Sequence, residues 1–176
     1  MTTYGKTTLV IGGCRSGKSR HALDISQNYN INKKKFLATS LILDQEMQDR
    51  VSKHRQERGS DWETIETPLD LPQELSRDFD ADTLLLVDCL TMWVNNMLLK
   101  EWSEDEITDA FFSFGKALQD IKARVVLISN EVGTGIVPGE RLSRMFRDYV
   151  GRLNQETAAL ADEVIWMVAG LPVNIK

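Results

Sequence analysis

The sequence has 176 residues, of which 42% are hydrophobic, so it is long enough for one sizeable core and short for two domains. Its formal net charge of −5 argues against a general nucleic-acid-binding protein, which normally carries a basic field. Because no apolar run approaches the roughly 20 residues of a membrane span and the first residues lack the apolar segment of a signal peptide, we expect one cytoplasmic domain over residues 1–176.

The most informative stretch lies near the start of the chain. An apolar run at residues 9–11 leads into the pattern Gly-x-x-x-x-Gly-Lys-Ser at residues 12–19, and helix-favouring sequence follows. This order of strand, loop and helix is the context that a phosphate-binding loop requires. Its backbone N–H groups can point at phosphate oxygens. We predict nucleotide contacts from Gly12, Gly13, Cys14, Arg15, Ser16, Gly17, Lys18 and Ser19.

Two side chains of this loop have distinct expected roles. Lys18 would bring a full positive charge to the β- and γ-phosphates, and Ser19 would offer its hydroxyl to Mg²⁺. The helix that begins here adds its positive dipole end. The loop therefore predicts binding of a nucleoside triphosphate.

The next segments alternate between helix and strand patterns. Residues 20–28 predict a helix packed on a sheet, and residues 28–35, which include three consecutive lysines, are expected to form a solvated turn. A short buried strand over residues 36–38 ends at Thr39 and Ser40. Since strand ends in open α/β sheets face the ligand crevice, these two residues are expected to line the site.

A second nucleotide signature follows further along the chain. Residues 44–57 predict a charged helix, residues 62–66 a strand, and residues 73–77 a short helix. The apolar run over residues 83–88 then ends in Asp88. A continuous apolar run fits a strand covered on both faces, and an acid at its end can reach Mg²⁺ through water.

The remainder of the chain completes the alternating pattern. Helices are predicted over residues 90–99, 104–122 and 140–161, and strands over residues 124–129 and 163–168. Phe111, Phe112 and Phe114 are expected to belong to the core. Residues 130–138 predict an ordered loop at the active edge. Strands alternating with helices predict a mostly parallel α/β sheet.

These motifs leave the reaction open. A phosphate loop and a strand-end acid occur in switches, motors and kinases, and the sequence at residues 130–133 does not match the Asn-Lys-x-Asp pattern of guanine-specific GTPases. Cys14 and Cys89 are too few for a disulfide framework and lack zinc-ligand spacing. We expect both to be partly buried thiols without a redox role.

Four segments together resemble the bifunctional adenosylcobinamide kinase/adenosylcobinamide-phosphate guanylyltransferase family of cobalamin synthesis. They are the phosphate loop at residues 12–20, Ala38-Thr39-Ser40, residues 50–55, and Asn-Glu-Val-Gly-Thr-Gly-Ile-Val-Pro at residues 130–138. The resemblance continues through residues 146–155 to the end of the chain. It implies a P-loop NTPase of the RecA-like type, with a mostly parallel central sheet flanked by helices.

The resemblance implies two reactions. Adenosylcobinamide is first phosphorylated on a side-chain hydroxyl with ATP or GTP, and GMP is then transferred from GTP to that phosphate through a histidine-GMP intermediate. His54 is the matching histidine. A neutral imidazole is a good nucleophile near pH 7, although a lone histidine on a charged helix is otherwise a surface residue. His21, the other histidine, is expected to be packed or solvent-exposed.

Further roles follow from matching positions in the family. Ala38, Thr39, Ser40, Arg55, Gln56, Glu57, Arg58, Glu66 and Asp88 are expected to contact the nucleotide, with Ser19 and Asp88 as Mg²⁺ ligands. Arginines suit phosphate, and a carboxylate at Glu66 can accept hydrogen bonds from guanine. Asp88 stands where some relatives carry Glu, so it could touch Mg²⁺, ribose or neither. Glu131 is either a catalytic carboxylate or a loop-structuring one.

Two rival functions stay open on the sequence. One is a different small-molecule kinase in which His54 is incidental, and the other is a nucleotide-dependent switch without small-molecule turnover. The resemblance also implies a homotrimer. The expected ligands are adenosylcobinamide, its phosphate, GTP and ATP, with no nucleic acid and no membrane.

Overall fold

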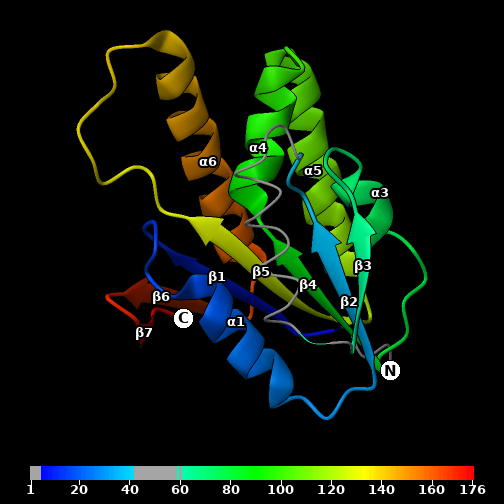
Figure 1. Ribbon diagram of the computed structural model, residues 1–176. Coiled ribbons are helices and arrows are strands. Elements are labelled where there is room, and N and C mark those ends of the chain that lie inside the picture. Colours follow the sequence, from blue (N-terminus) through cyan, green and yellow to red (C-terminus); the bar gives the residue numbers. More distant parts are fainter. Residues whose placement is uncertain (1–4, 42–58, 60) are drawn as a thin grey trace.

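A single sheet organises the chain in the computed structural model, which describes residues 5–41, 59 and 61–176. Its seven strands lie in the order β3-β2-β4-β5-β1-β6-β7 (Figure 1). All neighbouring strands are parallel except β6 and β7, which are antiparallel. The strands are β1 (Thr7–Gly12), β2 (Lys33–Ala38), β3 (Trp62–Glu66), β4 (Thr83–Asp88), β5 (Arg124–Asn130), β6 (Glu163–Val168) and β7 (Leu171–Asn174).

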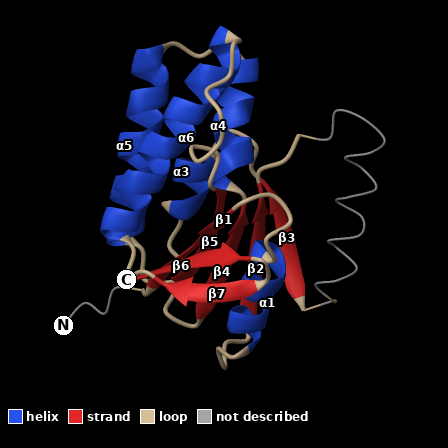
Figure 2. Ribbon diagram, turned by 90° about the vertical axis from the view of Figure 1, so that its left-hand side faces the viewer, coloured by secondary structure: helices blue, strands red, loops and turns tan. Residues whose placement is uncertain are grey.

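Helices cover both faces of this sheet. They are α1 (Lys18–Gln27), α3 (Leu71–Leu75), α4 (Leu90–Leu99), α5 (Glu104–Asp120) and α6 (Arg141–Leu160). Helices α3, α4, α5 and α6 lie on one side of the sheet and α1 on the other (Figure 2). Within the described part of the chain, no helix has the length and apolar composition that a membrane span requires.

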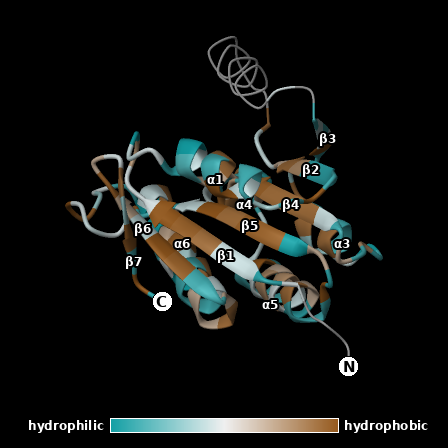
Figure 3. Cartoon of the chain, turned by 90° about the horizontal axis from the view of Figure 1, so that it is seen from below, coloured by the Kyte–Doolittle hydropathy of each residue, from teal (hydrophilic) through white to brown (hydrophobic). Residues whose placement is uncertain are grey.

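The two faces of the sheet form two separate hydrophobic clusters. Along β4, Leu85 and Val87 join the cluster under α4, α5 and α6, whereas Leu84 and Leu86 join the cluster on the α1 side. This alternation follows from the two-residue repeat of a strand. Because both faces are covered, β4 and β5 are hydrophobic along most of their length (Figure 3).

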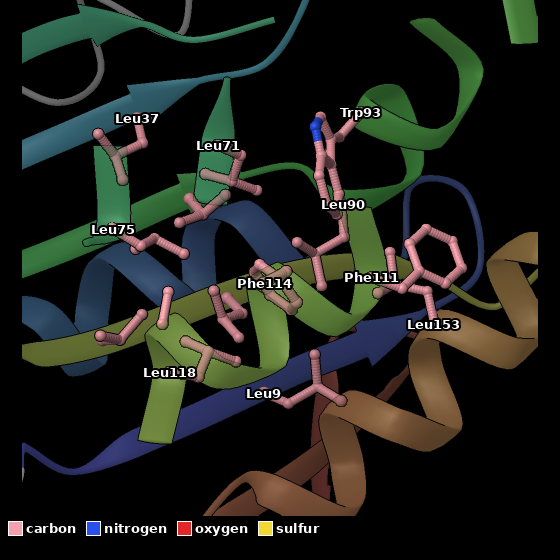
Figure 4. Close-up of a cluster of buried hydrophobic side chains, with 14 of the residues drawn as sticks. Leu9, Leu37, Leu71, Leu75, Leu90, Trp93, Phe111, Phe114, Leu118 and Leu153 are labelled. Atoms are coloured by element: carbon pink, nitrogen blue, oxygen red, sulfur yellow. The ribbon is translucent and has the colours of Figure 1, made fainter. Parts of the chain in front are cut away.

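The larger cluster has an aromatic centre. Trp93 on α4 packs between two phenylalanines of α5, with ring centroids 6.0 Å from Phe111 and 5.4 Å from Phe114 (Figure 4). The Trp93 indole N–H donates to the carbonyl oxygen of Leu69, 2.9 Å away. A fully buried tryptophan therefore has its polar atom satisfied, as buried indoles generally do.

Most of the predicted elements are confirmed, and so is the mostly parallel α/β sheet flanked by helices. The short helix expected at residues 73–77 instead spans Leu71–Leu75. Strand β7 was not predicted, since its four residues are all exposed and show no alternation of buried and exposed positions. The predicted helix over residues 44–57 lies outside the described residues.

Two predictions about local environment are wrong. The lysines at residues 33–35 begin β2 rather than forming a turn, and Lys33 and Lys35 are paired with Asp80 and Glu63. The cross-strand and loop carboxylates thus allow a charged sequence to start a strand. Phe112 is 75% exposed rather than in the core, because it points about 100° away from Phe111 around the helix.

A buried asparagine joins α4 to the loops that follow β2 and β3. The Asn96 side chain is fully buried, and its amide nitrogen donates to the carbonyl oxygens of Thr39 at 2.7 Å and Pro68 at 2.8 Å. Both acceptors lie just past the carboxyl ends of their strands. Asn96 therefore fixes two loops at the edge where the phosphate-binding loop also lies.

We expect Asn96→Leu to lower the free energy of unfolding by about 1–3 kcal/mol, because two buried carbonyl oxygens lose their donor. Urea unfolding followed by tryptophan fluorescence would measure this change. The matched control is Asn95→Leu, whose side chain is partly exposed on the same helix and which should stay within about 0.5 kcal/mol of the wild type. Equal stability of the two variants would contradict the assigned role of Asn96.

Candidate nucleotide-binding site

The phosphate-binding loop connects β1 to α1 and packs against β6. A Cβ atom at Gly12 would lie 2.6 Å from the carbonyl oxygen of Met167, so any side chain there would force β1 and β6 apart. Gly17 has φ of 93° at the start of α1, a left-handed conformation that favours glycine. The backbone packing at Gly12 and the backbone conformation at Gly17 therefore favour glycine. At Gly13, in contrast, a Cβ atom would meet no heavy atom within 4 Å.

Lys18 is a buried cation inside this loop. It is 8% exposed, and its Nζ donates to the carbonyl oxygen of Gly13 at 2.6 Å. Burial lowers the pKa of Lys18 below its ordinary value, while the nearby Asp88 carboxylate acts in the opposite direction. The Lys18 ammonium group is thus held within the loop by the Gly13 carbonyl oxygen, and an anionic ligand there would stabilise its charged form.

Asp88 reaches the loop from a strand that is not its neighbour. Strand β5 lies between β4 and β1, yet the Ser19 hydroxyl donates to Asp88 Oδ2 at 3.2 Å. A hydroxyl and a carboxylate are hard oxygen donors of the kind that Mg²⁺ takes. Among the described residues, no three His, Cys, Asp or Glu side chains are grouped as a metal site, so this pair would need phosphate oxygens and water to complete a coordination shell.

Three predicted site residues share one row across the sheet. Ala38 pairs in register with Glu66 of β3 on one side and with Asp88 of β4 on the other. Glu66 is exposed at the end of its strand. Three strands separate β3 from β1, which places Glu66 roughly 19 Å across the sheet from the phosphate-binding loop at about 4.8 Å per strand.

Thr39 has a different position from the one expected. Its side chain is fully buried, and its hydroxyl donates to the carbonyl oxygen of Cys89 at 2.7 Å and accepts from the Cys89 N–H at 2.8 Å. The hydroxyl is occupied by the backbone at the end of β4. Thr39 thus positions the segment that carries Asp88, and Ser40 beside it is partly exposed.

Glu131 lies beside the phosphate-binding loop. Its backbone N–H donates to the carbonyl oxygen of Gly12 at 2.9 Å, and its Oε1 accepts from the Gly133 N–H at 2.5 Å. Arg147 donates to the Gly133 carbonyl oxygen at 2.8 Å. The observed contact of the Glu131 carboxylate is therefore the loop-structuring one.

The two cysteines differ in environment. Cys89 is buried, and burial raises the pKa of its thiol to about 12. Cys14, in the loop between β1 and α1, is exposed rather than partly buried as expected. His21 is partly buried on α1, and its Nε2 has no hydrogen-bond partner among the described residues.

Other residues that support the loop were missed in the sequence. The turn between β6 and β7 touches it, since the Gly170 N–H donates to the carbonyl oxygen of Ser16 at 3.1 Å. Asn130, at the end of β5, is held through its backbone by Thr91 at 2.7 Å and Asn154 at 3.0 Å. An Ala-Gly pair between two apolar runs marks the turn in the sequence, but nothing local indicates its contact with Ser16.

The predicted residues His54, Arg55, Gln56, Glu57 and Arg58 lie outside the described residues. The structure brings together Gly12, Lys18, Ser19 and Asp88 as a compact group, with Glu131 at its border. Glu66 lies farther along the same edge of the sheet.

Residues 8–175 match the family described as cobinamide kinase / cobinamide phosphate guanyltransferase. The chain belongs to this family. A protein of Escherichia coli (strain K12), named bifunctional adenosylcobalamin biosynthesis protein CobU, is 42% identical over 96% of this chain and 98% of its own length. A Pseudomonas aeruginosa protein named bifunctional adenosylcobalamin biosynthesis protein CobP is 38% identical over 96% of both chains. Family membership indicates an enzyme of cobinamide metabolism.

Solved structures share the α/β fold of this family member at low sequence identity, and an ATPase and a recombinase are among them. The PH0250 protein of Pyrococcus horikoshii OT3 aligns with a TM-score of 0.60 at 10% identity, covering 98% of this chain and 87% of that one. An ATPase of a bacterial type III secretion system aligns with a TM-score of 0.54 at 12% identity, covering 97% of this chain and 57% of that one. The RadB recombinase aligns with a TM-score of 0.50 at 15% identity, covering 94% of this chain and 75% of that one.

The exposed thiol offers a direct test of nucleotide binding. At neutral pH a maleimide should modify Cys14 and leave Cys89 unreacted, because the thiolate is the reactive form and Cys89 is buried. GTP with Mg²⁺ at 100 times its Kd should slow the modification of Cys14 about 100-fold, in proportion to the unoccupied fraction. Mass spectrometry of timed samples gives both rates, and Cys14→Ser is the control. An unchanged rate would contradict binding at this loop.

Proposed function

We propose that this protein is a bifunctional enzyme of adenosylcobalamin synthesis. It phosphorylates adenosylcobinamide with ATP or GTP, and it then transfers GMP from GTP to the resulting phosphate to give adenosylcobinamide-GDP. The observation that carries the proposal is the group formed by Lys18 and the Ser19–Asp88 pair, at the strand edge of a chain that belongs to the cobinamide kinase / cobinamide phosphate guanyltransferase family. The relatives named as bifunctional support both activities.

In the kinase step, the substrate hydroxyl oxygen attacks the γ-phosphorus and the nucleoside diphosphate leaves. Lys18 exchanges the Gly13 carbonyl oxygen for phosphate oxygens, so that its charge faces the charge that develops in the transition state. Glu131 keeps the following loop beside Gly12 and, through its second oxygen, takes the proton of the substrate hydroxyl. Backbone N–H groups of the loop hold the phosphates.

Ser19 and Asp88 would hold Mg²⁺ in this site. The fit rests on their oxygen donors, which already lie 3.2 Å apart. One carboxylate and one hydroxyl suit an ion that keeps several waters and binds phosphate oxygens. When bound, Mg²⁺ offsets part of the negative charge of the triphosphate.

In the guanylyl transfer, we assign His54 as the nucleophile. Its imidazole nitrogen attacks the α-phosphorus of GTP, and pyrophosphate leaves. A phosphate oxygen of the phosphorylated cobinamide then displaces the histidine, giving the GDP-linked product and free imidazole. Arg55 and Arg58 would bind phosphate oxygens, and Gln56 and Glu57 belong to the same nucleotide-contacting segment.

Guanine selectivity is assigned to Glu66. Its carboxylate is exposed at the end of β3, where it can accept from the N1–H and exocyclic amine of guanine. Its position across the sheet from the phosphate-binding loop requires the nucleotide to extend along the strand edge during this step. The proposed homotrimer and the cytoplasmic location rest on the family resemblance and the sequence.

Incubation with GTP labelled at the α-phosphate tests the covalent step. We expect an acid-labile radioactive adduct on the wild-type protein, because a phosphoramidate on histidine is stable in base and labile in acid. Addition of phosphorylated cobinamide should move the label from the protein into a GDP-linked corrinoid. Gel autoradiography and chromatography follow the two species.

Two variants of this experiment identify the nucleophile. His54→Ala should leave the protein unlabelled, whereas His21→Gln should label as the wild type does. Labelling of His54→Ala, or no adduct on the wild type, would overturn the histidine intermediate. A labelled protein without transfer to the corrinoid would favour a nucleotide-dependent switch. Phosphorylation of a small molecule without guanylylation would favour a different kinase.

Loss of the Lys18 charge should affect both reactions. We expect Lys18→Ala to reduce kinase and guanylyltransferase turnover by about 100-fold or more, since one preorganised charge at a reacting phosphate has an effect of that order. Coupled assays of nucleoside diphosphate and pyrophosphate release measure the two activities separately. Lys33→Ala, which removes an exposed lysine paired with Asp80, is the control. Normal guanylylation by Lys18→Ala would show that the two reactions do not share the loop.

A further inference from the structure

The loop between β5 and α6 carries two neighbouring aliphatic side chains in solvent. Ile136 is 98% exposed and Val137 is 62% exposed. Leu142, in the first turn of α6, is 49% exposed. An exposed apolar residue by itself is ordinary, but consecutive large aliphatic residues at the tip of a loop beside a functional site indicate a contact surface.

The base of this loop is attached to the phosphate-binding loop. Glu131 begins it, and its backbone N–H donates to the Gly12 carbonyl oxygen at 2.9 Å. In Figure 1 the loop rises from the end of β5, next to the end of β1, and continues to the start of α6. The aliphatic tip therefore projects from the same strand edge that holds Lys18 and Asp88.

Charged side chains hold the loop in this projecting form. Arg144 donates to the carbonyl oxygens of Pro138 at 3.1 Å and Gly139 at 2.5 Å. Arg147 donates to the Gly133 carbonyl oxygen at 2.8 Å, and Glu131 accepts from the Gly133 N–H. Hydrogen bonds to ionised groups are stronger than neutral ones, so the backbone on both sides of the tip is fixed while the side chains at the tip stay largely exposed.

We propose that Ile136 and Val137 form a contact surface for the corrin macrocycle of the cobinamide substrate. This inference rests on the proposed function and assigns the substrate side of the same site. A corrinoid has a broad ring with methyl groups on its periphery and amide arms around it, and the hydroxyl that is phosphorylated lies on one arm. Such a ring is too wide to enter the phosphate-binding loop. It must be held outside the strand edge while the arm reaches inward.

The position of the tip satisfies that requirement. A fixed apolar surface beside the loop can cover methyl groups of the ring without engaging the nucleotide. Phe112, the exposed aromatic residue of α5, is not in this position. It lines a groove with Phe79 and Ile121. These two residues precede β4 and β5 and therefore lie at the opposite end of the strands. Phe112 is thus a matched control of similar apolar exposure.

Steady-state kinetics of the double variant Ile136→Ser/Val137→Ser tests the proposal. We expect the KM for cobinamide to rise about 10-fold or more, as when apolar contacts to a substrate are removed, while the KM for GTP and kcat stay close to those of the wild type. The conservative pair Ile136→Val/Val137→Ile should retain the wild-type KM for cobinamide. Phe112→Ser should change neither KM.

Each result supports or overturns the proposal. A wild-type KM for cobinamide in the serine variant overturns it, and so does an equal rise of the KM for GTP, which would make the tip part of the nucleotide site. An unchanged midpoint of thermal unfolding in the serine variant, expected because both side chains are exposed, excludes loss of folding. If the wild type turns over cobinamide and the variant matches it, only this inference fails. If the wild type makes no corrinoid phosphate, the proposed function fails as well.

Discussion

Parallel pairing of β1, β5 and β4 is the constraint on which the site depends. The carboxyl ends of these strands meet at one edge of the sheet, so the phosphate-binding loop, Glu131 and Asp88 follow three adjacent strands. Because β5 separates β4 from β1, Asp88 must reach across one strand to contact Ser19. A slip of one residue in either pairing would turn every side chain of the slipped strand to the other face and would separate the carboxylate from the hydroxyl.

The buried charge of Lys18 explains why the loop favours an anion. Removing an ammonium group from water has a large cost unless it is paired. Here a carbonyl oxygen accepts from Lys18 at 2.6 Å, and burial still lowers the pKa of the lysine. A phosphate in the loop would supply a full opposite charge. Ligand binding would therefore offset the free-energy cost of burying the Lys18 ammonium group, which folding alone does not offset. At Gly12 a Cβ atom would lie 2.6 Å from the Met167 carbonyl oxygen, so the start of the loop packs directly against β6.

The sequence predicted those parts whose cause is local. The glycine and lysine pattern identified the loop, and continuous apolar runs identified β1, β4 and β5, because a strand covered on both faces needs such a run. It did not predict β7, the exposure of Phe112, or the burial of Thr39, since each depends on a distant partner or on the rotation of a helix over the sheet. The Thr39 hydroxyl is buried because the Cys89 backbone lies opposite it, which no local pattern reveals.

Selectivity for a substrate has to come from outside the parts that are common to the fold. The fold is shared with chains named as an ATPase and a recombinase at 12% and 15% identity, so the fold alone does not determine the activity. The segment at residues 131–140 is attached to the core at its base, where the Glu131 N–H donates to Gly12 and Val132 packs against the larger hydrophobic cluster. Arg144 and Arg147 hold its backbone farther along. A loop held in this way can change its exposed side chains without disturbing the nucleotide site, because Ile136 and Val137 at its tip are largely exposed. One loop can therefore bind phosphate while a neighbouring loop, held by its own hydrogen bonds, contacts the substrate. In this way one fold can act on different substrates.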